Sequence, residues 1–273
     1  MVYNTIMVQL DIDMRATPRL TFAWNLAQRF DAGLIAFCAA EPHLLIPGDV
    51  DGTASTDTVE RQIADIEERL EALKSEFDNL VQGDTRTSWR GKVGDPTRHL
   101  ALHVRSADLL IAGTGTSGFG RLRTVDPGEL ILSTGRPVLF PAEGQRPIKG
   151  ESILVAWKDA REARRAVVDA MPFLTDARQV VVATIEEDER AGARDSAADV
   201  VRFLMKHGVK ARSEVVDVGG GYASEALSEI ATEVGADLMV SGGYGHNRLR
   251  EWIFGGVTRS LLEDASTNRF MSN

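Results

Sequence analysis

The sequence predicts an α/β protein built from two doubly wound domains in tandem, each with a parallel sheet of strand order 3-2-1-4-5. Three observations support this fold class. Short apolar runs alternate with amphipathic helical patterns along the chain, which is typical of a parallel sheet covered by helices on both faces. A set of apolar runs recurs in the same order in each half. The length of 273 residues suits about two domains.

The internal repeat is visible in two pairs of apolar runs. The run at 5–10 and its counterpart at 152–157 are each followed by a helical pattern. Near the end of each half, Ala-Asp-Leu opens a second apolar run, at 107–113 and at 236–242. Matched runs in matched order indicate an internal duplication of one structural unit.

The first half alternates between strands and helices. Pro18 suits the first turn of a helix, and Asp95-Pro96 is a cap followed by proline at the first helical position. The turn-rich stretch 41–57 is predicted to be a long loop. The strands are expected near 5–10, 33–39, 87–93, 108–113 and 137–140, and the helices near 17–30, 58–80, 96–106 and 126–134.

The second half repeats this alternation. His207-Gly208 is a helix stop signal. A polar stretch with Gly and Pro at 142–150 marks the boundary, so the domains are expected at 1–144 and 150–273. The strands are expected near 152–157, 178–184, 211–217, 237–242 and 267–271, and the helices near 160–173, 194–207, 222–235 and 256–265.

Composition excludes several classes of function. The formal net charge is −9, spread over both halves, which argues against nucleic acid and anionic membranes as partners. No run approaches the roughly 18 apolar residues of a membrane helix, and the N-terminal residues lack signal-peptide features. Cys38 is the single cysteine, so an intrachain disulfide and a CxxC metal site are excluded. A cytoplasmic location is expected.

Glycines after the fourth strand of the second half carry the strongest functional signal. In a doubly wound sheet the ligand crevice lies at the carboxyl ends of the strands, here between the first and fourth. Gly242 and Gly245 lie at this strand end, and Gly255-Gly256 opens the last helix. Glycine lets backbone amides approach a phosphate, and a helix start presents unpaired N–H groups. Alternatively, these glycines serve only to form turns and the helix start, and their spacing does not distinguish this role from phosphate binding.

The pattern Gly242-x2-Gly245-x9-Gly255, followed by Gly256-Val257-Thr258, resembles the nucleotide loop of the universal stress protein (UspA) family. The longer string 245–259 is a specific signature, and Asp126-Pro127-Gly128 with 135–139 closes the first half as in tandem members. The resemblance implies a flavodoxin-like, Rossmann-like strand order and, in many members, bound ATP. The cofactor-binding residues it implies are Gly242, Gly245, Gly255, Gly256, Val257 and Thr258.

The chain departs from the family pattern in both halves. Gly256 stands where ATP-binding members have Ser or Thr, so one hydroxyl is missing. Lys158 takes the place of an Asp that the family puts at the end of the first strand, whereas the first half keeps it as Asp11. The first half instead has Asp126-Pro127 at the expected phosphate-binding helix start, where a negative charge and a missing N–H disfavour phosphate. Its nucleotide loop is therefore expected to be degenerate.

The sequence offers no catalytic residues and no metal site. His99 and His103 are four residues apart, but no third ligand and no HExxH glutamate accompany them, so a surface pair is preferred over zinc. GxSxG and GxxxxGK[ST] motifs are absent. The chain is therefore expected not to be an enzyme, although turnover of a small phosphorylated or adenylated substrate is a third hypothesis.

The preferred interpretation is a cytoplasmic stress-response module that binds an adenine nucleotide, ATP or similar, in its second domain without efficient catalysis. The alternative is a nucleotide-free interaction protein of the same fold, which Lys158 and Gly256 favour. The halves are expected to pair through 137–140 and 267–271 as an internal pseudo-dimer, with a further homodimer left open. Asn268 and Arg269 suit a buried central strand poorly, so the last strand is expected to be short or frayed.

Overall fold

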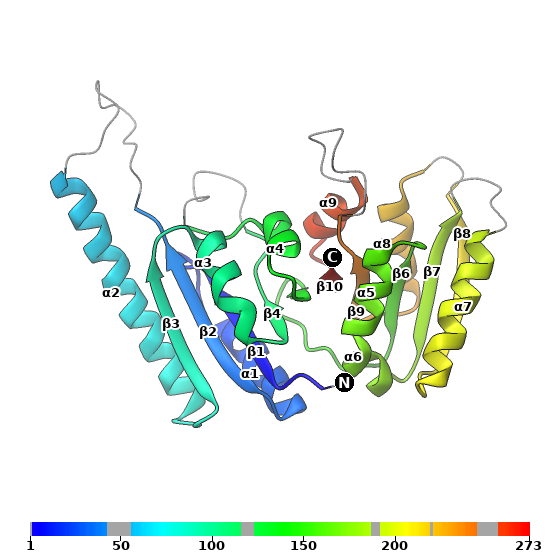
Figure 1. Ribbon diagram of the computed structural model, residues 1–273, viewed down its shortest axis with the longest axis horizontal. Coiled ribbons are helices and arrows are strands. Elements are labelled where there is room, and N and C mark those ends of the chain that lie inside the picture. The colour runs from blue at the N-terminus through cyan, green and yellow to red at the C-terminus, as the bar shows by residue number, and fades with distance from the viewer. Residues whose placement is uncertain (1, 43–55, 116–122, 187–191, 219–220, 245–255) are drawn as a thin grey trace, which may run out of the picture. The chain divides into compact units, whose positions relative to one another are not determined.

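Parallel strands joined by helices make up both units of the computed structural model (Figure 1). The structure describes residues 2–42, 56–115, 123–186, 192–218, 221–244 and 256–273. The chain divides into two units, Tyr3–Thr134 and one that contains Gly135–Asn273. The long loop expected at 41–57 falls largely outside the described residues.

The first unit has a parallel sheet in the order β3-β2-β1-β4. Helix α1 contacts α2, and α3 contacts α4, as expected when crossovers cover both faces of a doubly wound sheet. Its elements are β1 (Thr5–Leu10), α1 (Thr17–Phe30), β2 (Gly33–Ala40), α2 (Thr56–Val81), β3 (Thr87–Val93), α3 (Pro96–His103), the 3-10 helix η1 (Val104–Ser106), β4 (Leu109–Ile111) and α4 (Pro127–Ser133).

The second unit has the sheet order β8-β7-β6-β9-β10, with β5 antiparallel to β10. Counted from β6, this is the predicted order 3-2-1-4-5, so the doubly wound, flavodoxin-like fold class is confirmed. Its elements are β5 (Val138–Phe140), β6 (Ile153–Trp157), α5 (Arg161–Asp169), α6 (Met171–Asp176), β7 (Val180–Glu186), α7 (Gly192–Lys206), β8 (Ala211–Asp217), α8 (Ala223–Glu233), β9 (Leu238–Gly242), α9 (Gly256–Glu263) and β10 (Asn268–Ser272).

Sequence signals account for several of the helix ends. The side chains of Asp95 and Asp126 accept backbone N–H bonds at the starts of α3 and α4, each followed by proline. The single helix predicted over 160–173 is instead two helices, α5 and α6. Pro172 lies in the first turn of α6, because a proline inside one continuous helix would remove a hydrogen bond and clash with the preceding turn.

The last strand contradicts the expectation of a frayed end. β10 is paired on both sides, parallel to β9 and antiparallel to β5, and every residue of it is buried. Asn268 aligns with Leu238, and Arg269 aligns with Met239 and Phe140. The prediction that these two polar residues exclude a central strand is therefore wrong.

Hydrogen bonds explain how β10 tolerates Asn268. Its Oδ1 accepts from the backbone N–H of Ala142 at 2.9 Å. Its Nδ2 donates to the carbonyl oxygens of Asp237 at 2.8 Å and Arg146 at 3.1 Å. A buried amide with its donors and acceptor satisfied costs little, so Asn268 joins three segments of the second unit instead of disrupting its sheet.

Arg269 is accommodated in a comparable way. Its guanidinium donates from Nη1 to the carbonyl oxygens of Leu261 at 3.1 Å and Leu262 at 2.8 Å, in the last turn of α9. Nη2 donates to the carbonyl oxygen of Pro141 at 3.3 Å. Burial lowers the pKa of Arg269 to about 10, an effect that the negative charge of Asp264 opposes. The cation thus caps the C-terminal carbonyls of α9, where the helix dipole favours positive charge.

Candidate functional site

The second unit contains a cavity of about 530 Å³ where β6 and β9 lie side by side. This is the point at which the chain order of a doubly wound sheet reverses, the usual place for a ligand. The carboxyl ends of β6, β7 and β9 and the starts of α5, α8 and α9 contribute to it. Its apolar wall includes Ala156, Trp157, Ala183, Ile185, Leu227 and Leu261.

Four of the six residues expected from the sequence line this cavity: Gly242, Gly256, Val257 and Thr258. The other two, Gly245 and Gly255, lie outside the described residues. The structure therefore brings the end of β9 and the start of α9 together at one cavity, although they are separated by 13 residues in the chain.

The two described glycines of the motif have different surroundings. A Cβ atom at Gly242 would lie 2.6 Å from the backbone nitrogen of Ala163 and 2.8 Å from the carbonyl carbon of Glu162. Gly242 is therefore required for the close approach of β9 to α5, whatever binds in the cavity. A Cβ at Gly256 would meet nothing described within 4 Å, so packing does not demand glycine there.

The cavity's lining also includes hydroxyl and charged side chains. Ser241 and Thr258 are buried hydroxyl residues, and the backbone N–H of Tyr244 approaches Thr258 Oγ1 at 3.5 Å, the outer limit of a hydrogen bond. Lys158 is exposed at the end of β6. Glu162, in the first turn of α5, lines the cavity with only 3% of its surface exposed.

This arrangement is suited to binding. The start of α9, where a helix carries unpaired N–H groups and a partial positive charge, lines the cavity, and the apolar wall suits a flat ring. Among the residues that the structure describes, no three His, Cys, Asp or Glu side chains are grouped to hold a metal ion. The titratable side chains in the cavity's described lining are those of Lys158, Glu162 and Tyr244.

In the first unit the corresponding crevice contains a side-chain network instead. Asp11, at the end of β1, accepts from Arg19 Nη1 at 2.8 Å, from Gln9 Nε2 at 2.9 Å and from the Thr124 hydroxyl. Arg19 also donates to the backbone and side-chain oxygens of Gln9, both at 3.0 Å. Burial alone would raise the pKa of Asp11, but the charge of Arg19 and these hydrogen bonds outweigh it and hold that pKa below its usual value.

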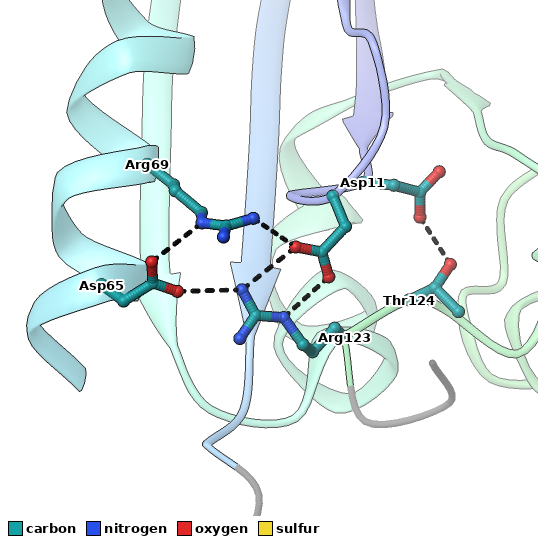
Figure 2. A network of polar contacts seen from close by, with 6 residues as sticks. Asp11, Asp65, Arg69, Arg123 and Thr124 are labelled. Carbon is teal, nitrogen blue, oxygen red and sulfur yellow. Dashed lines mark hydrogen bonds and ion pairs between the residues drawn. The ribbon is translucent and has the colours of Figure 1, made fainter. Parts of the chain in front are cut away.

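A second cluster lies beside this one and ties α2 to the segment before α4 (Figure 2). Asp13 accepts from Arg69 at 2.6 Å and from Arg123 at 2.8 Å. Asp65 pairs with the same two guanidiniums at 3.1 and 3.5 Å. Figure 2 shows Thr124, the neighbour of Arg123, reaching Asp11. The two clusters therefore fasten residues 123–124 across the end of β1.

Sequence reasoning missed Arg19 as a site residue. It lies eight residues after Asp11 in an amphipathic helix, where an arginine reads as an ordinary surface residue. Only the fold brings its guanidinium to the end of β4, where a Cβ at Gly113 would lie 2.3 Å from Arg19 Nη2. Elsewhere, Cys38 is buried, and Arg259 pairs with Glu263 on the surface of α9.

Comparison with known proteins agrees with this architecture. Residues 151–268 match the family model of the Universal stress protein family. The chain is similar to a solved universal stress protein from Archaeoglobus fulgidus DSM 4304, with 14% identity, TM-score 0.71, and coverage of 99% of this chain and 96% of that one. It is also similar to a functionally unknown protein from Pseudomonas aeruginosa PAO1, with 16% identity, TM-score 0.64, and coverage of 99% and 92%.

Shorter matches cover less than half of the chain. One is a universal stress protein in complex with cAMP, with 19% identity, TM-score 0.35, and coverage of 45% of this chain and 97% of that one. That likeness is too slight to bear on the ligand of this chain. No protein of curated function matches. Within the described residues, no helix combines the length and apolar character needed to cross a membrane. The second half therefore carries a universal stress protein domain, and the division of the chain into two units is consistent with a tandem member of that family.

Proposed function

We propose that the second half of this protein binds an adenine nucleotide, ATP or similar, and that the protein acts as a nucleotide-responsive stress regulator without efficient catalysis. The observation that carries the proposal is the cavity of about 530 Å³ between β6 and β9, with the start of α9 at its wall. Ligand pockets of roughly 300–1,000 Å³ accommodate molecules of this size.

The two ends of a nucleotide match different parts of the lining. The apolar side, with Trp157 and Ile185, suits a base and sugar. The hydroxyl of Thr258 and the first N–H groups of α9 suit phosphate oxygens, which accept hydrogen bonds and carry negative charge. Lys158, at the rim, adds a positive charge that favours the phosphate end.

Binding is proposed at one site per chain. In the first unit, Arg19 pairs with Asp11 at 2.8 Å beside Gly113, and Asp126 caps α4 by accepting from Glu129 N–H at 2.8 Å. A carboxylate thus already occupies the position at which a phosphate would meet that helix start. The first half is proposed to support the fold and to have lost nucleotide affinity.

A nucleotide-free interaction protein is the second candidate, and Glu162 is the observation that favours it. Its buried carboxylate lines the same cavity and would repel a phosphate that approached closely. Lys158 and Gly256, which replace residues of the ATP-binding pattern, point the same way. Under this candidate the cavity stays without a nucleotide at any cellular concentration.

The deciding experiment has two steps. The purified protein is heat-denatured and the supernatant is analysed for released nucleotide by chromatography and mass spectrometry. ATP is then titrated into ligand-free protein by calorimetry, and one site per chain is expected. Gly245→Asp, which adds a side chain and a charge in the glycine motif, is expected to abolish binding. Two equal sites, or a site that survives in this variant, would contradict the assignment to the second half.

A further inference from the structure

The first unit carries a local basic surface in an otherwise acidic protein. Residues 90–105 contain a single acidic residue, Asp95, whereas the whole chain has a net charge of −9. The basic surface is defined by the cationic and imidazole side chains of β3, α3 and η1, namely Arg90, Lys92, Arg98, His99, His103 and Arg105.

Several contacts place these side chains close together. Arg90 Nη1 donates to the carbonyl oxygen of His103 at 3.1 Å and to Ser106 Oγ at 3.0 Å, which ties β3 to the end of α3. The His99 ring folds back onto the turn after β3, so that a Cβ at Gly94 would lie 2.5 Å from its Nε2. The charges of Arg90, Lys92, His99 and Arg105 all reach His103 and add to the effect of burial in lowering its pKa.

The positive charge of this surface is only partly compensated. The Asp95 carboxylate is used as the cap of α3, where it accepts from Arg98 N–H at 2.7 Å. Lys92 and Arg98 are exposed, and neither forms an ion pair with another described residue. Leu102, on the same short helix, is 55% exposed. A partner that fits would therefore combine carboxylates with an apolar side chain.

The neighbouring sheet edge narrows the choice of partner. β3 ends the strand order of the first unit and pairs with β2 alone among the described strands. The opposite face of β3 is covered by α2, through the Phe77–Trp89 ring contact at 6.2 Å. An edge strand offers backbone N–H and C=O groups to an extended chain, which a peptide can pair with and a nucleic acid cannot.

We infer that the basic surface and the edge of β3 dock an extended acidic peptide segment of a partner protein. The peptide's carboxylates pair with Lys92, Arg98 and their neighbours, and an apolar residue covers Leu102. Nucleic acid is the less suitable occupant, because nucleic-acid-binding domains are usually basic overall and this chain is acidic. The inference is independent of nucleotide binding in the second half.

Fluorescence anisotropy tests the inference directly. The probe is a fluorescein-labelled peptide of roughly ten residues that alternates Glu and Val, a typical strand length. We expect saturable binding to the full chain that weakens as salt rises to about 0.15 M, where the Debye length is about 8 Å. The double variant Lys92→Glu/Arg98→Glu should weaken binding about tenfold or more. The double variant Lys206→Glu/Lys210→Glu, on exposed residues of the second unit, is the matched control and should change it less than about twofold.

Four results of the binding assay would overturn the inference. They are no binding up to about 1 mM protein, equal loss in both double variants, tighter binding of a labelled oligo-dT than of the peptide, and tight binding of a peptide that carries Lys in place of Glu. Self-association of the chain that is lost in Lys92→Glu/Arg98→Glu would also overturn it, since a second copy would then be the occupant. Circular dichroism of each variant checks that it is folded.

Discussion

Gly256 offers a pair of substitutions that test nucleotide binding without disturbing the fold. It is exposed at the start of α9, and a Cβ atom there would meet no described atom within 4 Å. Gly256→Ser restores the hydroxyl that the ATP-binding pattern has at this position. Gly256→Asp adds a chain of comparable size with a negative charge. Both residues are favourable near a helix start, so neither variant is expected to lose stability.

The expected effects have opposite signs. A hydrogen bond to a charged acceptor contributes about 1.5–3 kcal/mol. The exposure of this site favours the low end, so Gly256→Ser should bind ATP about tenfold more tightly. A carboxylate about 4 Å from a phosphate charge costs about 1 kcal/mol in bulk water and about 4 kcal/mol at the lower effective dielectric of a protein surface. Gly256→Asp should therefore weaken binding by about fivefold to a thousandfold.

Isothermal titration calorimetry of ATP into the three proteins measures both effects, and thermal unfolding without ligand checks the stability of each. The affinity for ATP should be highest in Gly256→Ser, intermediate in the original chain and lowest in Gly256→Asp. If Ser and Asp leave the affinity equally unchanged, phosphate does not lie near the start of α9. If neither variant nor the original chain binds ATP, adenosine or cAMP at millimolar concentration, the nucleotide-free candidate stands.

Three further predictions concern stability. Arg269→Met should lower the free energy of unfolding by about 2–3 kcal/mol, because it leaves buried carbonyls of α9 without donors. It should also weaken nucleotide binding, because α9 lines the cavity. Urea denaturation measures the first effect and calorimetry the second. Deleting 268–273 should prevent cooperative folding of the second unit, because it removes a buried strand that is paired on both sides, and a stable truncated chain by circular dichroism would contradict this. Arg19→Met should cost about 3 kcal/mol at pH 7, because it leaves Asp11 buried without its cation. The folded-state pKa of Asp11 lies below 3.8, so its contribution to stability is present above pH 3.8 and lost as the pH falls through the lowered folded value. The difference in free energy of unfolding between the original chain and Arg19→Met, measured by urea denaturation, should therefore become smaller at acidic pH.

Most of the fold could be predicted from the sequence because it depends on local and repeated patterns. Apolar runs at 5–10 and 152–157 become β1 and β6, which are buried in the middle of their sheets. Asp95 and Asp126 begin helices as their spacing to proline indicates. These signals act over a few residues, and the doubly wound topology follows from their alternation.

The last strand could not be predicted because its stability depends on distant partners. Propensity disfavours Asn268 and Arg269 at the centre of a sheet. The atoms that satisfy them, such as the N–H of Ala142 and the carbonyl of Pro141, lie more than 120 residues away in the chain. A single sequence contains no signal that links such distant positions. Strand propensity therefore predicts a frayed end where a long-range hydrogen-bond network stabilises a buried strand.

The contrast between the two halves rests on side chains at one equivalent position of the repeat. Gly113 and Gly242 are the last residues of the matched runs 107–113 and 236–242. Gly113 lies two residues after β4, and Gly242 is the last residue of β9. A Cβ at Gly113 would meet the Arg19 guanidinium, whereas a Cβ at Gly242 would meet the backbone of Ala163. In the first half a long cation thus enters the crevice and pairs with Asp11. In the second half the backbone of Ala163 lies against Gly242 instead, and both residues line the cavity of that unit, so the two halves differ in the side chains around a shared backbone arrangement.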